Sequence, residues 1–224
     1  FLSSPAISNG VAYFGSGDHY VYALDVATGA QRWKFLTGNV VHASPAVAGA
    51  TVYVGSWDRY FYALDARSGA VRWRFATGDD RVTYNQVGIA GSAAVADGMV
   101  YFGCRDSTFY ALNARTGALA WKHDEHGSWV VGSPAVANGV VYYTTSDEKR
   151  FWALDSRTGA EKFNAPYGSF AFSSPSLAGG VAYFGTFDGR LYGVNARSGE
   201  VVARFSTDAS AKNLPAHLDK SGNV

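Results

Sequence analysis

Cross-links, membrane spans and strong charge are all missing from this sequence. Among 224 residues there is one cysteine, Cys104, so the chain can form no internal disulfide and no cysteine-rich metal site. No apolar run approaches the roughly eighteen residues that a membrane-spanning helix needs, so we expect no direct insertion into a bilayer. Charged residues make up 17% and the net charge is +1, which gives no sign of binding to nucleic acid or to a membrane surface.

Aromatic residues and glycine, by contrast, are abundant. Aromatic residues make up 15% of the chain, and there are 26 glycines. This mixture suits a closed β-architecture with many tight turns, and it argues against disorder. The length alone allows one domain or two, and the internal repeats favour one.

Five segments share the pattern Ala-Leu-Asp-x-x-Thr/Ser-Gly-x-x-x-Trp, at a spacing of about forty residues. The three fullest copies run from Ala23 to Trp33, from Ala63 to Trp73 and from Ala111 to Trp121. A fourth copy ends in Phe163 instead of Trp, and a fifth, which ends at Ala203, keeps only the Asn-x-x-Ser-Gly centre. A period of this kind indicates repeated units that cannot bury their apolar faces alone.

Residues 44–78 show what one repeat encodes. Alternating β-branched and aromatic residues predict short strands at 44–48, 51–56, 60–65 and 70–75. Tight turns separate them, and nothing helical intervenes between repeats. We therefore predict an all-β fold, a β-propeller of four-stranded antiparallel blades. A β-solenoid is the rival, but its coils are shorter and lack two hairpin turns per unit.

Five blades are visible within residues 1–208, at about 3–37, 43–77, 91–123, 132–165 and 173–207, and 209–224 form a tail or the start of a further repeat. Five blades can close a ring, but no strand exchange between the two ends is visible, which favours part of a larger ring. The repeated ring and the turn glycine are expected to hold neighbouring blades together. These structural residues are Trp33, Trp73, Trp121, Phe163, Gly29, Gly69, Gly117, Gly159 and Gly199.

The repeated pattern resembles the tryptophan-docking motif of the pyrroloquinoline-quinone (PQQ)-type propellers, over residues 4–207. The resemblance implies seven or eight blades in the whole ring and a periplasmic or otherwise extracytoplasmic location. The family includes quinoprotein alcohol dehydrogenases, the lipoprotein scaffold of the outer-membrane β-barrel assembly machine and sensor domains of bacterial kinases. Function must therefore be argued from the site.

The dehydrogenases of that family carry features that this sequence lacks. They have a vicinal disulfide beside the quinone, which Cys104 alone cannot supply, and they bind calcium or a lanthanide through clustered carboxylates. Here the acids recur at the blade period and are expected to cap turns, as Asp18, Asp58, Asp106, Asp147, Asp188, Asp25, Asp65 and Asp155. We expect no catalytic residue and no cofactor. PQQ with calcium enters only under the alternative that the chain is a segment of a dehydrogenase.

Binding residues are expected where the repeats differ from one another. The loops between blades share one face, at the mouth of the central channel, with the turns between second and third strands. The loop at 78–91 is the longest, although a tolerated surface loop is an equal alternative there. The candidates are His42, Trp57, Arg59, Arg81, Tyr84, Asn85, Gln86, Arg105, His126, Trp129, Phe170 and Phe172.

The loop from His123 to Trp129 groups two histidines with Asp124 and Glu125. Two histidines at this spacing could suit a metal, but no third ligand is identifiable. We expect a solvated polar loop and no metal site.

The leading prediction is a non-catalytic propeller that acts as a protein- or ligand-binding scaffold in an extracytoplasmic assembly. Turn charges that alternate in sign favour a protein or peptide partner at the channel mouth over an apolar ligand. Two alternatives stay open: a segment of a quinoprotein dehydrogenase, and the sensor domain of a membrane kinase.

Overall fold

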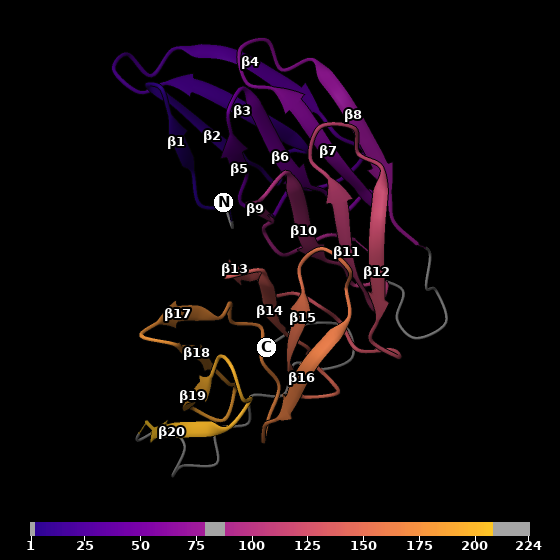
Figure 1. Ribbon diagram of the computed structural model, residues 1–224. Helices are drawn as coiled ribbons and strands as arrows, with labels where there is room; N and C mark the ends of the chain where they lie inside the picture. Colours follow the sequence, from indigo (N-terminus) through magenta and orange to yellow (C-terminus); the bar gives the residue numbers. More distant parts are fainter. Residues whose placement is uncertain (1–2, 79–87, 208–224) are drawn as a thin grey trace.

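The computed structural model describes residues 3–78 and 88–207, which form twenty strands in five four-stranded antiparallel sheets (Figure 1). The strands are β1 (Ala6–Ser8), β2 (Val11–Gly15), β3 (Tyr20–Asp25) and β4 (Gln31–Leu36); β5 (Ala46–Ala48), β6 (Thr51–Gly55), β7 (Tyr60–Asp65) and β8 (Val71–Ala76); β9 (Ala94–Ala96), β10 (Met99–Gly103), β11 (Thr108–Asn113) and β12 (Leu119–Asp124); β13 (Ala135–Ala137), β14 (Val140–Thr144), β15 (Arg150–Asp155) and β16 (Glu161–Pro166); β17 (Ser176–Ala178), β18 (Val181–Gly185), β19 (Arg190–Asn195) and β20 (Val201–Ser206).

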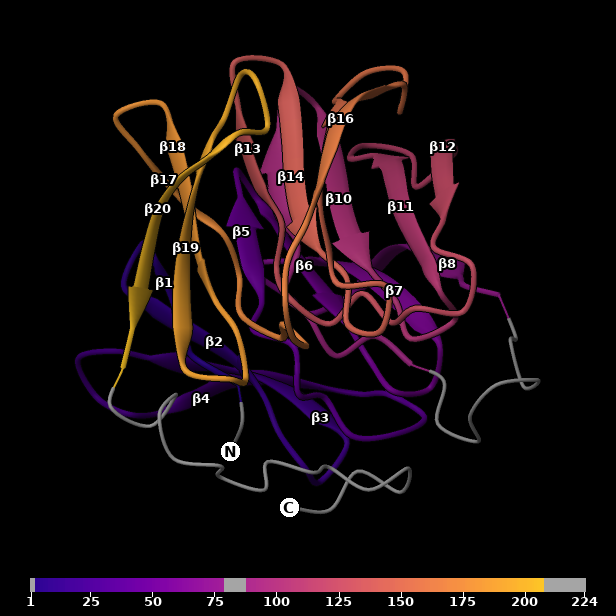
Figure 2. The same ribbon diagram turned by 90° about the horizontal axis from the view of Figure 1, so that it is seen from below.

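The five sheets are successive blades of a β-propeller, as the repeats predicted. Their innermost strands contact one another in the order β1, β5, β9, β13 and β17, and the outer strands radiate from that centre (Figures 1 and 2). No helix in the described part of the chain is long and apolar enough to cross a membrane.

A serine before each innermost strand links it to the next blade. The backbone N–H of Ser4 donates to Oγ of Ser44 at 2.8 Å, and that of Ser44 donates to Oγ of Ser92 at 2.9 Å. The same bond runs from Ser92 to Ser133 at 3.0 Å and from Ser133 to Ser174 at 2.9 Å. This continuous chain of hydrogen bonds joins all five blades around the axis, and it explains why serine opens every repeat.

The turn between third and fourth strands is stabilised by the aspartate or asparagine that precedes it. In the first blade, Oδ1 of Asp25 accepts bonds from the N–H and the hydroxyl of Thr28, both at 3.0 Å. Arg32 donates to Oδ2 at 2.6 Å, and this bond is the main reason that the pKa of Asp25 falls to about 2. The carboxyl is thus occupied by its own turn.

The repeated tryptophans lie against the following blade. The indole Nε1 of Trp33 donates to the carbonyl of Ala66, that of Trp73 to Ala114, and that of Trp121 to Ser156, each at 3.0 Å. The ring also covers the turn glycine of the next blade, as Trp33 covers Gly69. Gly29 differs from the expectation: a Cβ there would meet nothing within 4 Å, because no described blade precedes it.

Between blades, the third strand of one packs its aromatic rings on the second strand of the next. The rings of Phe61 and Phe102 stack at 4.2 Å, and those of Phe151 and Phe184 stack at 5.2 Å. Leu191, at the matching position of the last blade, is 42% exposed, whereas Phe61 and Phe151 are 0% exposed. The apolar core of the molecule therefore lies in the seams between blades.

Candidate functional site

The candidate site is the face on which each loop between blades meets the turn that joins the second and third strands of the next blade. We call this surface the mouth face. The N–H of Trp57 donates to the carbonyl of Val40 at 3.1 Å, and that of Arg105 donates to Gly88 at 3.1 Å. The same bond recurs from Phe187 to Phe170 at 2.9 Å. Backbone bonds thus hold the non-repeated loops and turns in contact, so their side chains lie on one supported surface.

Four of the predicted residues form a continuous group on this face, which we call the mouth stack: His42, Trp57, Arg105 and Trp129. The ring of His42 meets that of Trp57 edge-on, with centroids 5.3 Å apart. The guanidinium carbon of Arg105 lies 4.8 Å from the centroid of Trp57 and 3.6 Å from that of Trp129. Cation–π contacts of this kind fix the position of a charged group without neutralising it.

Burial sets the electrostatics of the mouth stack. Arg105 is only 8% exposed, and desolvation lowers its pKa to about 10, which still leaves it charged at neutral pH. Burial also lowers the pKa of His42, so its ring is neutral at that pH. Two donors, Nε of Arg105 and Nε1 of Trp57, are sealed from solvent without a hydrogen bond in the described structure.

A second aromatic group lies on the same kind of loops and turns, at the seam between the fourth and fifth blades. Phe172 contacts Phe187 edge-on with centroids 4.9 Å apart, and Nζ of Lys149 lies 5.2 Å above the ring of Phe170. Phe170 and Phe187 are 42% and 40% exposed. Exposed rings beside a cation offer a binding surface to a partner segment in which polar and apolar side chains alternate.

The remaining candidates have separate surroundings. Arg59 occupies the left-handed position of its turn, with φ of 72°, and its carbonyl accepts bonds from the N–H and hydroxyl of Thr77. His126 is largely exposed, and its Nδ1 lies 3.9 Å from Oδ1 of Asp124. Four predicted residues lie outside the described part of the chain: Arg81, Tyr84, Asn85 and Gln86.

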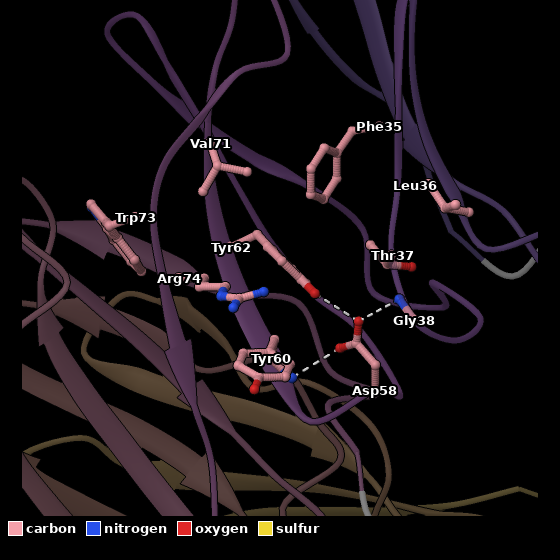
Figure 3. A pocket seen from close by; sticks show the side chains of 10 residues that line it. All are labelled: Phe35, Leu36, Thr37, Gly38, Asp58, Tyr60, Tyr62, Val71, Trp73 and Arg74. Atoms are coloured by element: carbon pink, nitrogen blue, oxygen red, sulfur yellow. Dashed lines mark hydrogen bonds between the residues drawn. The ribbon is translucent and has the colours of Figure 1, made fainter.

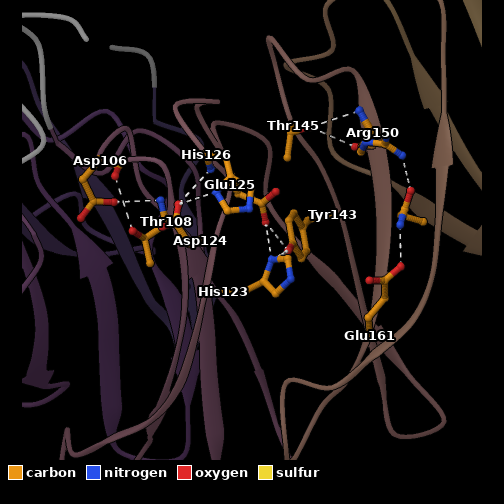
Figure 4. A network of polar contacts seen from close by, with 11 residues as sticks. Asp106, Thr108, His123, Asp124, Glu125, His126, Tyr143, Thr145, Arg150 and Glu161 are labelled. Atoms are coloured by element: carbon orange, nitrogen blue, oxygen red, sulfur yellow. Dashed lines mark hydrogen bonds and ion pairs between the residues drawn. The ribbon is translucent and has the colours of Figure 1, made fainter. Parts of the chain in front are cut away.

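The acid at position 125 was wrongly expected to lie in a solvated loop. Glu125 is 0% exposed, and its Oε1 lies 2.9 Å from Nδ1 of His123 and accepts a hydrogen bond from Tyr143 (Figure 4). The bond to Glu125 raises the pKa of His123 despite partial burial. Residues 3–78 and 88–207 contain no group of three or more metal-binding side chains.

The repeat register contains the signal that would have found this cluster. His123 follows Trp121 by two positions, where the earlier copies have Phe35 and Phe75. Glu125 takes the position of Thr37 and Thr77. A residue that replaces a phenylalanine or a largely buried threonine in a repeat is expected to be buried, whatever its charge. The cluster therefore belongs to the seam between the third and fourth blades.

An open groove with a volume of about 750 Å³ lies between β4 and β8 (Figure 3). At its floor, Oδ2 of Asp58 accepts bonds from the hydroxyl of Tyr62 and the N–H of Gly38, both at 2.7 Å. The third blade repeats this pair, because Tyr110 donates to Asp106 at 2.6 Å. The groove is thus lined by residues that recur in the repeats and stabilise the scaffold. The mouth face is therefore the better candidate for a binding site.

Known proteins resemble this chain in sequence family and in fold. The family described as outer membrane protein assembly factor BamB, a PQQ-repeat family, matches residues 1–124 and 62–216. No curated protein sequence matches. BamB from Moraxella catarrhalis superposes with a TM-score of 0.79 at 22% identity, over 92% of this chain and 64% of that one.

Two other solved structures share the fold. Quinohemoprotein alcohol dehydrogenase from Comamonas testosteroni has a TM-score of 0.78 at 18% identity, over 91% of this chain and 42% of that one. The computationally designed protein Ika8 has a TM-score of 0.76 at 17% identity, over 91% of this chain and 61% of that one. The chain thus spans less than two thirds of each of these three structures. At sequence identities this low, the similarity shows a shared fold and nothing about function. By the family match, which covers most of its length, the chain belongs to the PQQ-repeat family described as outer membrane protein assembly factor BamB.

Proposed function

We propose that this protein is a non-catalytic scaffold of an extracytoplasmic assembly and that it holds a protein or peptide partner on its mouth face. The mouth stack carries this proposal. Trp57 and Arg105 come from turns of the second and third blades, and His42 and Trp129 come from loops between blades. The four residues differ from the matching residues of the other repeats and meet on one supported face. Tryptophan and arginine are the residues that most often dominate protein interfaces. The family description, which names an assembly factor, supports the same proposal.

A dehydrogenase activity finds less support in this chain. Its one cysteine, Cys104, cannot form a vicinal disulfide, and burial raises the pKa of the thiol to about 12, so it is not a reactive thiolate. We propose that no cofactor is required. Alcohol-dependent reduction of a dye after addition of PQQ and calcium would contradict this part of the proposal.

Site-specific photo-crosslinking tests the binding face. A photoreactive amino acid at Phe170 on the mouth face is compared with one at Val26, in a turn between third and fourth strands at the other end of the blade. The two positions are 42% and 51% exposed, so access to solvent does not favour the first. We expect a discrete crosslinked protein, identified by mass spectrometry, from position 170 only. Equal crosslinking at position 26, or none at 170, would overturn the proposal.

A further inference from the structure

Arg105 is a cation that the propeller scaffold does not require. It occupies the first position of the turn between second and third strands, where other blades have Gly17, Trp57 and Phe187. The blades with Trp57 and Phe187 form the turn and its backbone bond to the preceding loop without a charge at this position. A role outside the scaffold must therefore account for the burial of a guanidinium here.

Among the residues that the structure describes, the guanidinium has two ring contacts and no hydrogen-bond acceptor. It lies 3.6 Å from the ring centroid of Trp129 and 4.8 Å from that of Trp57. Nε is sealed and unpartnered, whereas the two terminal nitrogens are not among the sealed atoms. None of the three nitrogens forms a hydrogen bond or ion pair within residues 3–78 and 88–207. Burying a charge in this state is costly unless an anion pairs with it.

Three acids of this turn and the neighbouring turns already have partners. Asp106 accepts bonds from the hydroxyl of Tyr110 at 2.6 Å and from the N–H of Thr108 at 3.1 Å. Asp58 is held by Tyr62 and Gly38, and Asp147 by the hydroxyl of Ser146 at 2.5 Å. These three carboxyls thus stabilise the turns. Within the part of the chain that the structure describes, none of them pairs with Arg105, which is a buried cation without a counter-charge there.

We propose that Arg105, with Trp57 and Trp129, binds the carboxylate of an acidic residue on the peptide segment that the mouth face receives. This inference rests on the proposed function and names the chemistry of its partner. The planar guanidinium fork matches a carboxylate with two parallel hydrogen bonds, and ring contacts hold it in place beforehand. The adjoining indoles provide apolar surface for the side chain next to the acid.

Two capped peptides test the proposal on the intact protein: acetyl-Gly-Phe-Glu-Phe-Gly-amide and the same peptide with Gln in place of Glu. Binding is followed by NMR through the indole N–H signals of Trp57 and Trp129 and the Nε–H signal of Arg105. We expect the Glu peptide to bind at least about tenfold more tightly than the Gln peptide, and the Nε–H signal to shift only with Glu.

Variants assign the effect to Arg105. Arg105→Gln should remove the preference for Glu, and Arg105→Lys, which keeps the charge without the fork, should retain only a small part of it. Arg115→Gln, at an exposed turn at the other end of the blade, should keep the full preference. If Arg105→Gln fails to fold, the affinities of the unmodified protein for the two peptides still test whether the mouth face prefers a carboxylate.

Other outcomes separate this inference from the proposed function. Equal binding of both peptides to the unmodified protein and to Arg105→Gln would overturn the carboxylate contact but leave the mouth face as a binding surface. Binding of neither peptide would also overturn the carboxylate contact. The proposed function would then be judged by crosslinking at Phe170, which does not depend on Arg105.

Discussion

Single glycines show how closely neighbouring blades approach one another. Gly69 and Gly29 occupy the same turn position in successive repeats, with φ of 73° and 72°. A Cβ on Gly69 would come within 2.8 Å of Cδ2 of Trp33, whereas one on Gly29 would meet nothing within 4 Å. The pair therefore separates the cost of the left-handed backbone from the cost of the contact between blades.

We predict that Gly69→Ala destabilises the protein more than Gly29→Ala does. Both changes place alanine at positive φ, which costs about 1–2 kcal/mol. Only Gly69→Ala also forces a methyl group into the indole of Trp33, which adds ~1–3 kcal/mol. Urea unfolding of the two variants measures the difference, and equal losses of stability would contradict the account of the seam.

The buried pair of His123 and Glu125 predicts that the free energy of unfolding depends on pH. The pKa of His123 is raised above its ordinary value of 6.5, mainly by the bond to Glu125. Its contribution to stability is therefore fully present below about pH 6.5, the pKa of an unfolded histidine, and is lost as the pH rises through the higher pKa of the folded state.

We predict that His123→Phe, which restores the residue of the first two repeats, removes this pH dependence from the free energy of unfolding. The single change leaves Glu125 buried without its cation and should cost ~3–5 kcal/mol at pH 5.5. Adding Glu125→Thr, again the residue of the first two repeats, should recover most of that loss. A double variant as unstable as the single one would show that the charges are not coupled. His42 is unchanged in each protein, so its own titration cancels in the comparison.

Among the elements, the seams between blades differ in how they are closed. Trp33 and Trp121 are 7% and 9% exposed, and both donate Nε1 to a carbonyl of the next blade. Phe163 covers Gly199 in the last described seam, but its ring has no N–H to donate. The strands β17 to β20 also expose Leu191 and Phe205, at 42% and 63%. Among the described residues, the fifth blade is thus held by fewer contacts than the second, third and fourth blades.

We predict that amide hydrogens of β19 exchange with solvent faster than those of β7, which has a neighbouring blade on both sides. Local opening requires less free energy where fewer apolar contacts and hydrogen bonds must break. Native-state hydrogen–deuterium exchange at several urea concentrations measures both strands. Equal protection of β7 and β19 would contradict this ranking.

For the whole molecule, the sequence predicted the fold more completely than the site. The turn signals, which recur five times, and the Trp, which recurs three times, identify four-stranded blades because these features are local. Trp57, Arg105 and Trp129 were also predicted as binding candidates, but their contact depends on how three blades are placed around the axis. Glu125 was mispredicted because the residue that buries and pairs with it, Tyr143, comes from the following blade.

The central claim is that the repeated tryptophans form the scaffold whereas the non-repeated mouth residues bind the partner. Trp121 and Trp129 lie eight positions apart and have these different surroundings. The most direct test measures, for Trp129→Ala and Trp121→Ala, both the melting temperature and the affinity for the protein crosslinked from position 170. We predict that Trp129→Ala weakens binding by at least about tenfold and lowers the melting temperature by less than about 4 °C. Trp121→Ala should lower the melting temperature by well over that amount, since burying its ring contributes ~3–5 kcal/mol. Full binding by Trp129→Ala would contradict the account.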